Sequence, residues 1–171
     1  MLCLIALVAA PSLVACSSGE RQPPPEAISS LGIQLEGDAT QAQLSTFLDH
    51  KPREWAWAGG QFDAPDDRAP LAADTPQTFA WHADPADFAV GNNASDVAMT
   101  HLLSFASGSN ASLLDVFTTL NEYTPDTAAW HELLAAHEAI TVSLTTASFL
   151  GAQLPVAGGP FIGQSLTFTI E

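Results

Sequence analysis

Residues 140–147 read ITVSLTTA and give the clearest secondary-structure signal in the chain. The apolar side chains of Ile140, Val142 and Leu144 alternate with hydroxyl side chains at the positions between them. Successive side chains of a β-strand point to opposite faces of a sheet, so this period of two predicts a strand with one buried and one solvated face. Antiparallel sheets commonly have this asymmetry.

The same alternation recurs on both sides of this stretch. In residues 97–106 it places His101 on an otherwise apolar face, and the SGSN sequence at 107–110 predicts the turn of a hairpin. Residues 41–48 fit either a strand or a short helix. The segments that we predict as strands are 31–35, 54–58, 78–82, 97–106, 113–119, 140–147 and 166–170.

One helix is predicted between the strands at 113–119 and 140–147. Thr124 can cap its N-terminus, Pro125 suits the first helical position, and Asp126 complements the helix dipole. Beyond them, apolar residues recur at helical spacing along a single stripe. The stripe consists of Trp130, Leu133, Leu134 and His137, and the helix should end near His137.

These elements together predict a mainly β domain over residues 31–171. The strands are short and mostly have one polar face, so we expect antiparallel sheets packed as a β-sandwich with one short crossover helix. Residues 61–77 and 83–96 are rich in Pro, Asp and Asn and are predicted to be loops.

The charge of the chain is strongly unbalanced. Its 171 residues include 19 Asp and Glu but only 4 Lys and Arg, which gives a net charge of -15, while 47% of the residues are apolar. The apolar content suits a folded domain with an ordinary core. The negative charge disfavours nucleic-acid binding, because the phosphate backbone would be repelled. An anionic membrane surface would give no attraction either, so membrane attachment would need a lipid or apolar anchor.

The chain begins with MLCLIALVAAPSLVAC, an apolar run that ends at a cysteine. The run is too short to span a bilayer, which needs about 20 residues, but its length suits the core of a signal peptide. Its last four residues, Leu13-Val14-Ala15-Cys16, resemble the lipobox of bacterial lipoproteins. This resemblance implies that residues 1–15 are a lipoprotein signal peptide and that Cys16 is lipidated and becomes the mature N-terminus.

Residues 16–30 would then hold the lipidated cysteine and a flexible linker. The linker sequence is polar and proline-rich, which favours an extended spacer. The other cysteine, Cys3, lies in the leader, so no disulfide and no cysteine-based metal site is expected in the domain. Leu2 follows Met1 directly, without the basic residues that the family normally has there, so either the true start lies upstream or the signal is atypical. The alternatives are an ordinary secretory signal and a short buried N-terminal helix.

A second resemblance covers roughly residues 75–171. A strand with Phe79 and Trp81, a hairpin, a crossover through Tyr123 and Pro125, and two final strands follow one another in this region. This order is similar to that of fibronectin type III or immunoglobulin-like modules of bacterial envelope proteins. The resemblance implies a binding or spacer role rather than chemistry.

The histidines around 131–137 differ from a zinc-protease motif in their spacing. In H-E-x-x-H the histidines are four apart and meet on one helix face, whereas His131 and His137 would lie about 240° apart around a helix. The sequence also has no G-x-S-x-G, phosphate-loop or dinucleotide-binding motif. We therefore predict no catalytic residues, no cofactor and no enzyme activity.

Metal binding is the main alternative to a plain binding role. Imidazoles suit copper and zinc, and clustered carboxylates suit calcium. No pair of the histidines has tight ligand spacing, and neither run of aspartates matches the D-x-[DN]-x-[DN]-G calcium loop. No metal ligand is therefore assigned, and His101 is expected to be a buried, hydrogen-bonded histidine. The residues considered are His50, His82, His101, His131 and His137, then Asp63, Asp66, Asp67 and Asp74, and finally Asp84, Asp87 and Asp96.

The tryptophans Trp55, Trp57, Trp81 and Trp130 could form a carbohydrate-stacking platform if they were exposed. Aromatic residues at alternating strand positions are more often part of the core, so burial is expected.

Taken together, the sequence predicts a lipid-anchored protein of the cell envelope with a non-catalytic binding or structural β-sandwich module. Its expected partners are the membrane, through the N-terminal lipid, and a protein or carbohydrate ligand, but not nucleic acid. In the lipoprotein family, aspartate after the cysteine is associated with inner-membrane retention, so Ser17 favours the outer membrane. The alternative is a periplasmic or surface lipoprotein that binds copper, zinc or calcium.

Overall fold

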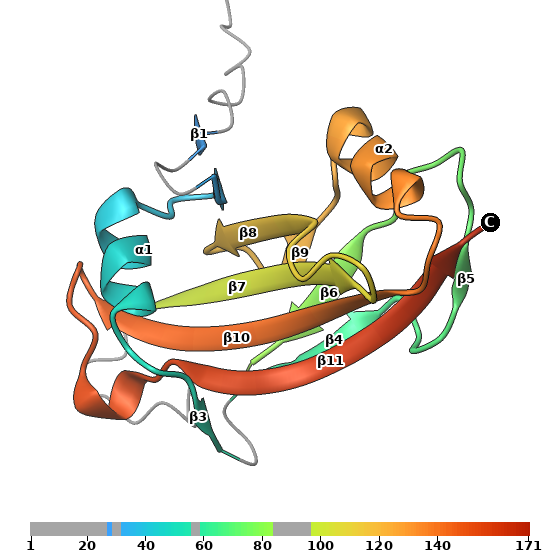
Figure 1. The fold of residues 1–171 in the computed structure, drawn as a ribbon. Helices are drawn as coiled ribbons and strands as arrows, with labels where there is room; N and C mark the ends of the chain where they lie inside the picture. The colour runs from blue at the N-terminus through green and yellow to red at the C-terminus, as the bar shows by residue number, and fades with distance from the viewer. Residues whose placement is uncertain (1–26, 29–31, 56–58, 84–96) are drawn as a thin grey trace, which may run out of the picture.

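The structure is a computed structural model that describes residues 27–28, 32–55, 59–83 and 97–171. Within these residues the chain is mainly β, with two short helices, one large mixed sheet and one small antiparallel sheet (Figure 1). The strands are β1 (Ala27–Ile28), β2 (Gln34–Glu36), β3 (Arg53–Glu54), β4 (Gln61–Ala64), β5 (Pro70–Leu71), β6 (Phe79–His82), β7 (Val97–Ser107), β8 (Leu114–Thr118), β9 (Glu122–Tyr123), β10 (Ile140–Leu150) and β11 (Phe161–Ile170). The helices are α1 (Gln41–Leu48) and α2 (Thr127–Ala135), with a 3-10 turn, η3 (Val156–Gly158).

The large sheet has the order β1-β2-β8-β7-β10-β11-β3, and β5 also pairs with β11. Its centre is formed by the long antiparallel strands β7, β10 and β11, with the predicted β7–β8 hairpin beside them. The strand predicted at 140–147 is confirmed. It continues to Leu150, because β10 pairs with β7 as far as Leu150 opposite Val97. The small sheet has the order β4-β6-β9.

One face of the large sheet carries the main core. Ile140, Val142 and Leu144 are buried there, as their alternation predicts. The small sheet packs on the same core, where the Phe79 ring of β6 lies 5.1 Å from the Phe105 ring of β7. Residues of α2 complete this cluster. Burying each such side chain stabilises the fold by roughly 1.5–3 kcal/mol.

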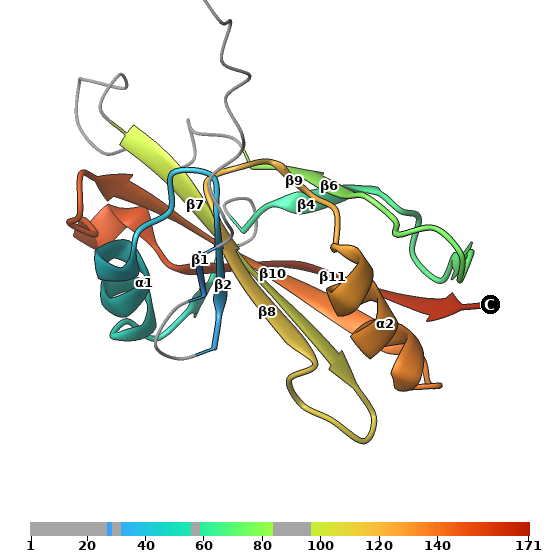
Figure 2. The same ribbon diagram turned by 90° about the horizontal axis from the view of Figure 1, so that it is seen from above.

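The opposite face of the same sheet carries a second, smaller core at one end. There Ala147 and Phe149 of β10 are buried with Leu44 and Phe47 of α1, and the Phe47 ring lies 5.2 Å from the Phe117 ring. Because α1 covers this end, the last part of β10 is buried on both faces and its polar alternation stops. Figure 2 shows α1 and α2 at opposite ends of the molecule.

Residues 41–48, which fit two structures by sequence, form α1. The Thr40 hydroxyl accepts a hydrogen bond from the Gln43 backbone N–H at 3.2 Å, and the Gln43 side-chain oxygen accepts one from the Thr40 N–H at 3.0 Å. This reciprocal capping box satisfies two backbone donors and fixes the start of the helix.

Helix α2 begins later than the sequence predicts. Its cap is Asp126 rather than Thr124, and the Asp126 carboxylate accepts a hydrogen bond from the Ala129 N–H at 2.7 Å. The helix ends at Ala135, and His137 has a left-handed backbone (φ 52°), which cannot continue it. In the described parts of the chain, neither helix has the length and apolar character needed to span a bilayer.

The expectation of purely antiparallel sheets in a β-sandwich needs correction. Three short strands run parallel to their neighbours, β2 beside β8 and both β3 and β5 beside β11. These are pairings of only two or three residues, made by segments that return from distant parts of the sequence. The arrangement is also not clearly a sandwich. The large sheet packs against the small sheet and α2 on one face and against α1 on the other, so two helices contribute where one was expected.

Several predicted boundaries shift as well. The strand predicted at 31–35 is β2, that at 54–58 is represented by β3, and residues 56–58 lie outside the described residues. The loop predicted at 61–77 contains the short strands β4 and β5. The last strand, β11, begins at Phe161 rather than 166. The alternation did not reveal its first part, because a bulge opposite β10 interrupts the pattern there.

Candidate functional site

The structure does not bring the predicted metal-ligand candidates together. Four of the five histidines are exposed: His131 and His137 border the same hollow beside α2, whereas His50 and His82 lie elsewhere. His82 Nδ1 lies 2.8 Å from Asp63 Oδ1, which forms an exposed pair between β6 and β4. Among the described residues no group of three or more His, Cys, Asp or Glu side chains is placed to hold a metal ion.

The aspartates at 63–74 have separate positions rather than a common one. Asp67 Oδ1 accepts a hydrogen bond from the Thr167 N–H at 2.9 Å and so fastens its loop to β11. Asp66 and Asp74 are exposed. The second group that the sequence offered, Asp84, Asp87 and Asp96, lies outside the described residues.

His101 is fully buried and hydrogen-bonded, which confirms the prediction for it. Its Nδ1 lies 3.1 Å from the Thr146 hydroxyl, which itself donates to the Gly59 carbonyl at 2.9 Å. Since the Thr146 proton is engaged, the ring donates through Nδ1. Burial lowers the pKa of His101 to about 4, while the Asn121 side chain acts weakly in the opposite direction. The role of His101 is therefore structural.

The tryptophans divide between core and surface. Trp81 and Trp130 are buried, as expected, and the Trp130 indole donates a hydrogen bond to the Ala73 carbonyl at 3.0 Å. Trp55 does not follow the prediction, because 52% of it is exposed. Trp57 lies outside the described residues.

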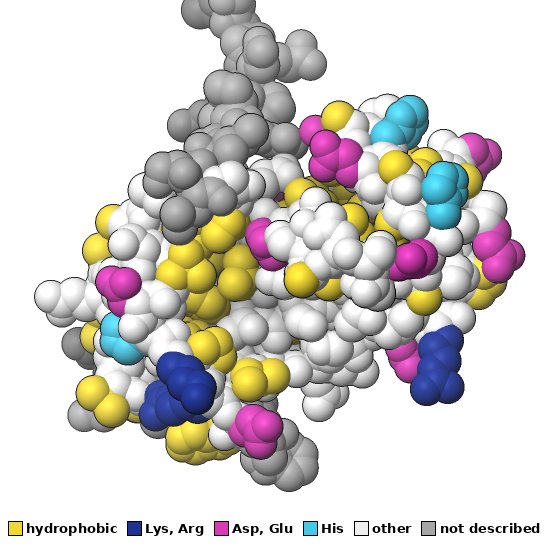
Figure 3. Space-filling model, viewed as in Figure 1, with side chains coloured by type: hydrophobic (Ala, Val, Ile, Leu, Met, Phe, Trp, Pro, Cys, Tyr) yellow, Lys and Arg dark blue, Asp and Glu magenta, His cyan; other side chains and the backbone are white. Residues whose placement is uncertain are grey.

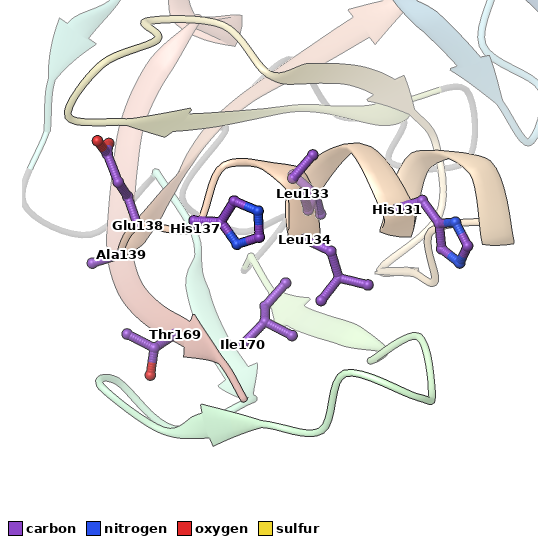
Figure 4. Close-up of a pocket in the computed structure, with 9 residues that line it drawn as sticks. His131, Leu133, Leu134, His137, Glu138, Ala139, Thr169 and Ile170 are labelled. Carbon is purple, nitrogen blue, oxygen red and sulfur yellow. The ribbon is translucent and has the colours of Figure 1, made fainter.

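A hollow of about 600 Å³ lies between α2 and the end of β11. Its apolar lining comes from Leu133, Leu134 and Ile170, and its polar lining includes His137 and Thr169. Figure 4 shows His137 beside Leu134 and Ile170. We call this space the α2–β11 hollow. Its mixture of apolar and hydrogen-bonding groups could accept an amphipathic ligand group.

The titratable groups around the α2–β11 hollow do not converge. Figure 4 shows His131 on the far side of Leu134 from His137, while the Glu138 carboxylate is directed away from the other side chains. Glu138 accepts a hydrogen bond from the Ser109 N–H at 3.1 Å and so holds the β7–β8 turn. An acid–base pair needs its two groups within reach of one reacting atom, and this arrangement does not provide that.

At the opposite end of the molecule, exposed apolar residues lie beside two cations. We call the surface formed by Lys51, Arg53, Trp55, Val156 and Ile162 the apolar end. Of these side chains, Trp55 is 52%, Val156 is 89% and Ile162 is 45% exposed. In Figure 3, apolar side chains lie next to Lys and Arg side chains at the end where Figure 1 places β3.

Contacts around Phe161 hold the apolar end together. The Arg53 guanidinium lies 4.9 Å from the centroid of the Phe161 ring and donates a hydrogen bond to the Val156 carbonyl at 2.7 Å. The Trp55 ring meets the same phenyl ring edge-on at 5.2 Å. One buried aromatic ring therefore positions the exposed indole and the exposed guanidinium.

Two glycines allow the chain to approach β11 closely beside Trp55. A Cβ atom at Gly59 would collide with the Ile162 carbonyl, and one at Gly163 would collide with the Gly59 backbone. The Gln164 N–H donates to the Gly60 carbonyl at 3.0 Å, which closes this contact. Glycine is thus required sterically where β11 bulges.

The sequence patterns did not predict the apolar end. Its signal was the KPREW segment at 51–55, which holds two of the four Lys and Arg in the chain beside a tryptophan. Val156 and Ile162 come from a distant segment, and only folding places them there.

The predicted lipidation site, Cys16, and the signal peptide at 1–15 lie outside the described residues. No protein-family model, curated protein or solved structure matches the chain.

Proposed function

We propose that this chain is a lipid-anchored protein of the cell envelope, with a non-catalytic binding or structural module as its folded part. The observation that carries the proposal is the lipobox-like segment Leu13-Val14-Ala15-Cys16 at the end of an apolar run. Such a leader would direct export, and acylation of Cys16 would attach the domain to a membrane, with Ser17 favouring the outer membrane.

We also propose a fold type for this module. An immunoglobulin- or fibronectin type III-like sandwich receives support from Phe79, which bridges the two sheets. Its ring lies 5.1 Å from Phe105 and 5.3 Å from Phe168, both on the large sheet. Modules of this kind serve as spacers or present surfaces for binding.

The α2–β11 hollow is the proposed ligand site. Its mixture of apolar and polar lining residues suits part of a protein or carbohydrate ligand. The engagement of Glu138 with the Ser109 N–H supports a binding role over a catalytic one, because a carboxylate that holds a turn is not free to act as a base. The metal-binding alternative has less support, since the described His and Asp side chains are dispersed.

Lipidation is tested by replacing Cys16 with Ala. In cells that express the full chain, we expect the protein to move from the membrane fraction to the soluble fraction. The matched control is Cys3→Ala, which removes the leader's cysteine and should leave the protein in the membrane fraction. Mass spectrometry of the purified protein should show acyl chains on the parent and on Cys3→Ala, but not on Cys16→Ala. Unchanged detergent partitioning of Cys16→Ala would refute the anchor.

A further inference from the structure

Exposed apolar side chains are concentrated at one end of the described molecule. They lie at the end of α1, after β3, at the end of β10, in η3 and near the start of β11. These five are Leu48, Trp55, Leu150, Val156 and Ile162, whereas Leu120 lies elsewhere, after β8. A patch of this kind on a soluble domain marks an interaction surface.

The charge of this end differs from that of the rest of the chain. Lys51 and Arg53 balance Asp49 and Glu54, so this segment is neutral in a chain whose net charge is -15. An anionic surface would repel most of the protein, but it would not repel this end. The charge distribution therefore selects the apolar end as the part that can approach a negatively charged layer.

We propose that the apolar end rests on the surface of a phospholipid membrane. A half-exposed tryptophan beside Lys and Arg is the combination typical of the membrane–water interface. Val156, at 89% exposure, and Ile162 would enter the boundary between headgroups and acyl chains. The long Lys51 and Arg53 side chains would reach the phosphates while their stems stay in apolar surroundings.

The position of the predicted anchor is compatible with this contact, although this step rests on the proposed lipidation of Cys16. Ten residues lie between Cys16 and Ala27, and a fully extended chain from one to the other spans at most about 40 Å. Strands β1 and β3 form the two opposite edges of the large sheet. The length of the linker therefore allows the apolar end to reach the membrane that holds the lipid, although the linker joins the domain at the other edge.

The test uses residues 16–171 with Cys16→Ser, which contain the entire described fold and cannot be acylated at that position. We expect this parent protein to float with vesicles made of phosphatidylcholine and phosphatidylglycerol in equal parts. The double variant Lys51→Glu/Val156→Asp changes two exposed side chains and should lower the partition coefficient by about 25-fold or more. Reversing one charge near an anionic surface changes binding by roughly fivefold for each charge unit.

The matched control is Arg68→Glu/Leu120→Asp, which makes the same change in charge and removes one exposed leucine far from the apolar end. Its binding should stay within about threefold of the parent, because charges beyond a Debye length are screened. The proposal is overturned if the parent does not float, or if both variants lose binding equally. A parent that does not float but still captures a protein from the envelope would instead assign this surface to a protein partner. Neither result depends on lipidation, which the Cys16→Ala experiment decides separately.

Discussion

The Nδ1 atom of His101 lies 3.1 Å from the hydroxyl of Thr146, across the pair formed by β7 and β10. Both side chains are fully buried, and the Thr146 hydroxyl also donates a hydrogen bond to the Gly59 carbonyl. The hydrogen-bonded chain therefore joins two central strands to the segment that supports Trp55. Burial disfavours the charged form of this imidazole, which makes the fold sensitive to acid.

The first prediction concerns pH. His101 has a folded-state pKa of about 4 against 6.5 when unfolded, so the unfolded state binds more protons between these values. Stability is complete above 6.5 and falls as the pH is lowered, by about 2 kcal/mol at about pH 5. Denaturant unfolding of the parent and of His101→Gln at about pH 7.5 and about pH 5 measures this loss. The variant should be less stable overall but show a flatter pH dependence, and equal slopes would contradict the assignment.

The second prediction concerns Thr146. Thr146→Val keeps the shape of the side chain but leaves the His101 Nδ1–H and the Gly59 carbonyl without their partner. We expect a loss of about 2–4 kcal/mol in the free energy of unfolding. Thr141→Val is the control on the same strand, because its hydroxyl bonds Thr167 in a partly exposed position, and its cost should be within about 0.5 kcal/mol. Similar losses in both variants would show that the buried hydrogen bonds of Thr146 contribute no more to stability than the partly exposed one of Thr141.

The third prediction concerns the bulge of β11. Gly163→Ala would force its Cβ against the Gly59 backbone and should cost about 2–3 kcal/mol in the free energy of unfolding. The comparison is Gly151→Ala, where the backbone is left-handed (φ 61°) but no atom lies within 4 Å of the added carbon. That variant should lose only about 1 kcal/mol, from backbone strain. Thermal melts that rank the two in the reverse order would place the close contact elsewhere.

The fourth prediction concerns the two faces of β10. Ile140→Asp would bury a charge in the main core and should prevent stable folding, as should Phe168→Asp on the neighbouring strand. Ser143→Asp places the same charge on the polar face of β10, and this variant should fold with a small loss of stability. Circular dichroism during heating distinguishes these results, and a folded Ile140→Asp protein would show that the inward face is misassigned.

Much of the central sheet could be predicted from the sequence. The alternation at 140–147 and 97–106 identified the strands and their buried faces, because a period of two leaves one set of side chains for the core. His101 was also placed correctly, since a histidine on an apolar face must be buried and bonded. The same alternation stopped being informative after Thr146, where α1 covers the second face of β10.

The remaining features depend on contacts between distant segments. The parallel pairing of β3 with β11 involves two residues on each side and leaves no periodic signal. The Thr40–Gln43 capping box was present in the sequence, but residues 41–48 are decided as a helix only once Phe47 packs in the second core. Trp55 was expected inside because alternation favours burial, yet it follows β3, a two-residue edge strand in which both residues are exposed. The apolar end itself combines segments about a hundred residues apart, so local patterns could not reveal it.

Strand β10 contributes to both cores, with Ile140, Val142 and Leu144 in one and Ala147 and Phe149 in the other. It lies between β7 and β11 and pairs with both. Because both cores contain side chains of β10, neither core can unfold without disrupting the other. The domain should therefore unfold as one cooperative unit. In hydrogen–deuterium exchange, the β10 amides should open only with the whole molecule, while the short edge strands exchange through local openings.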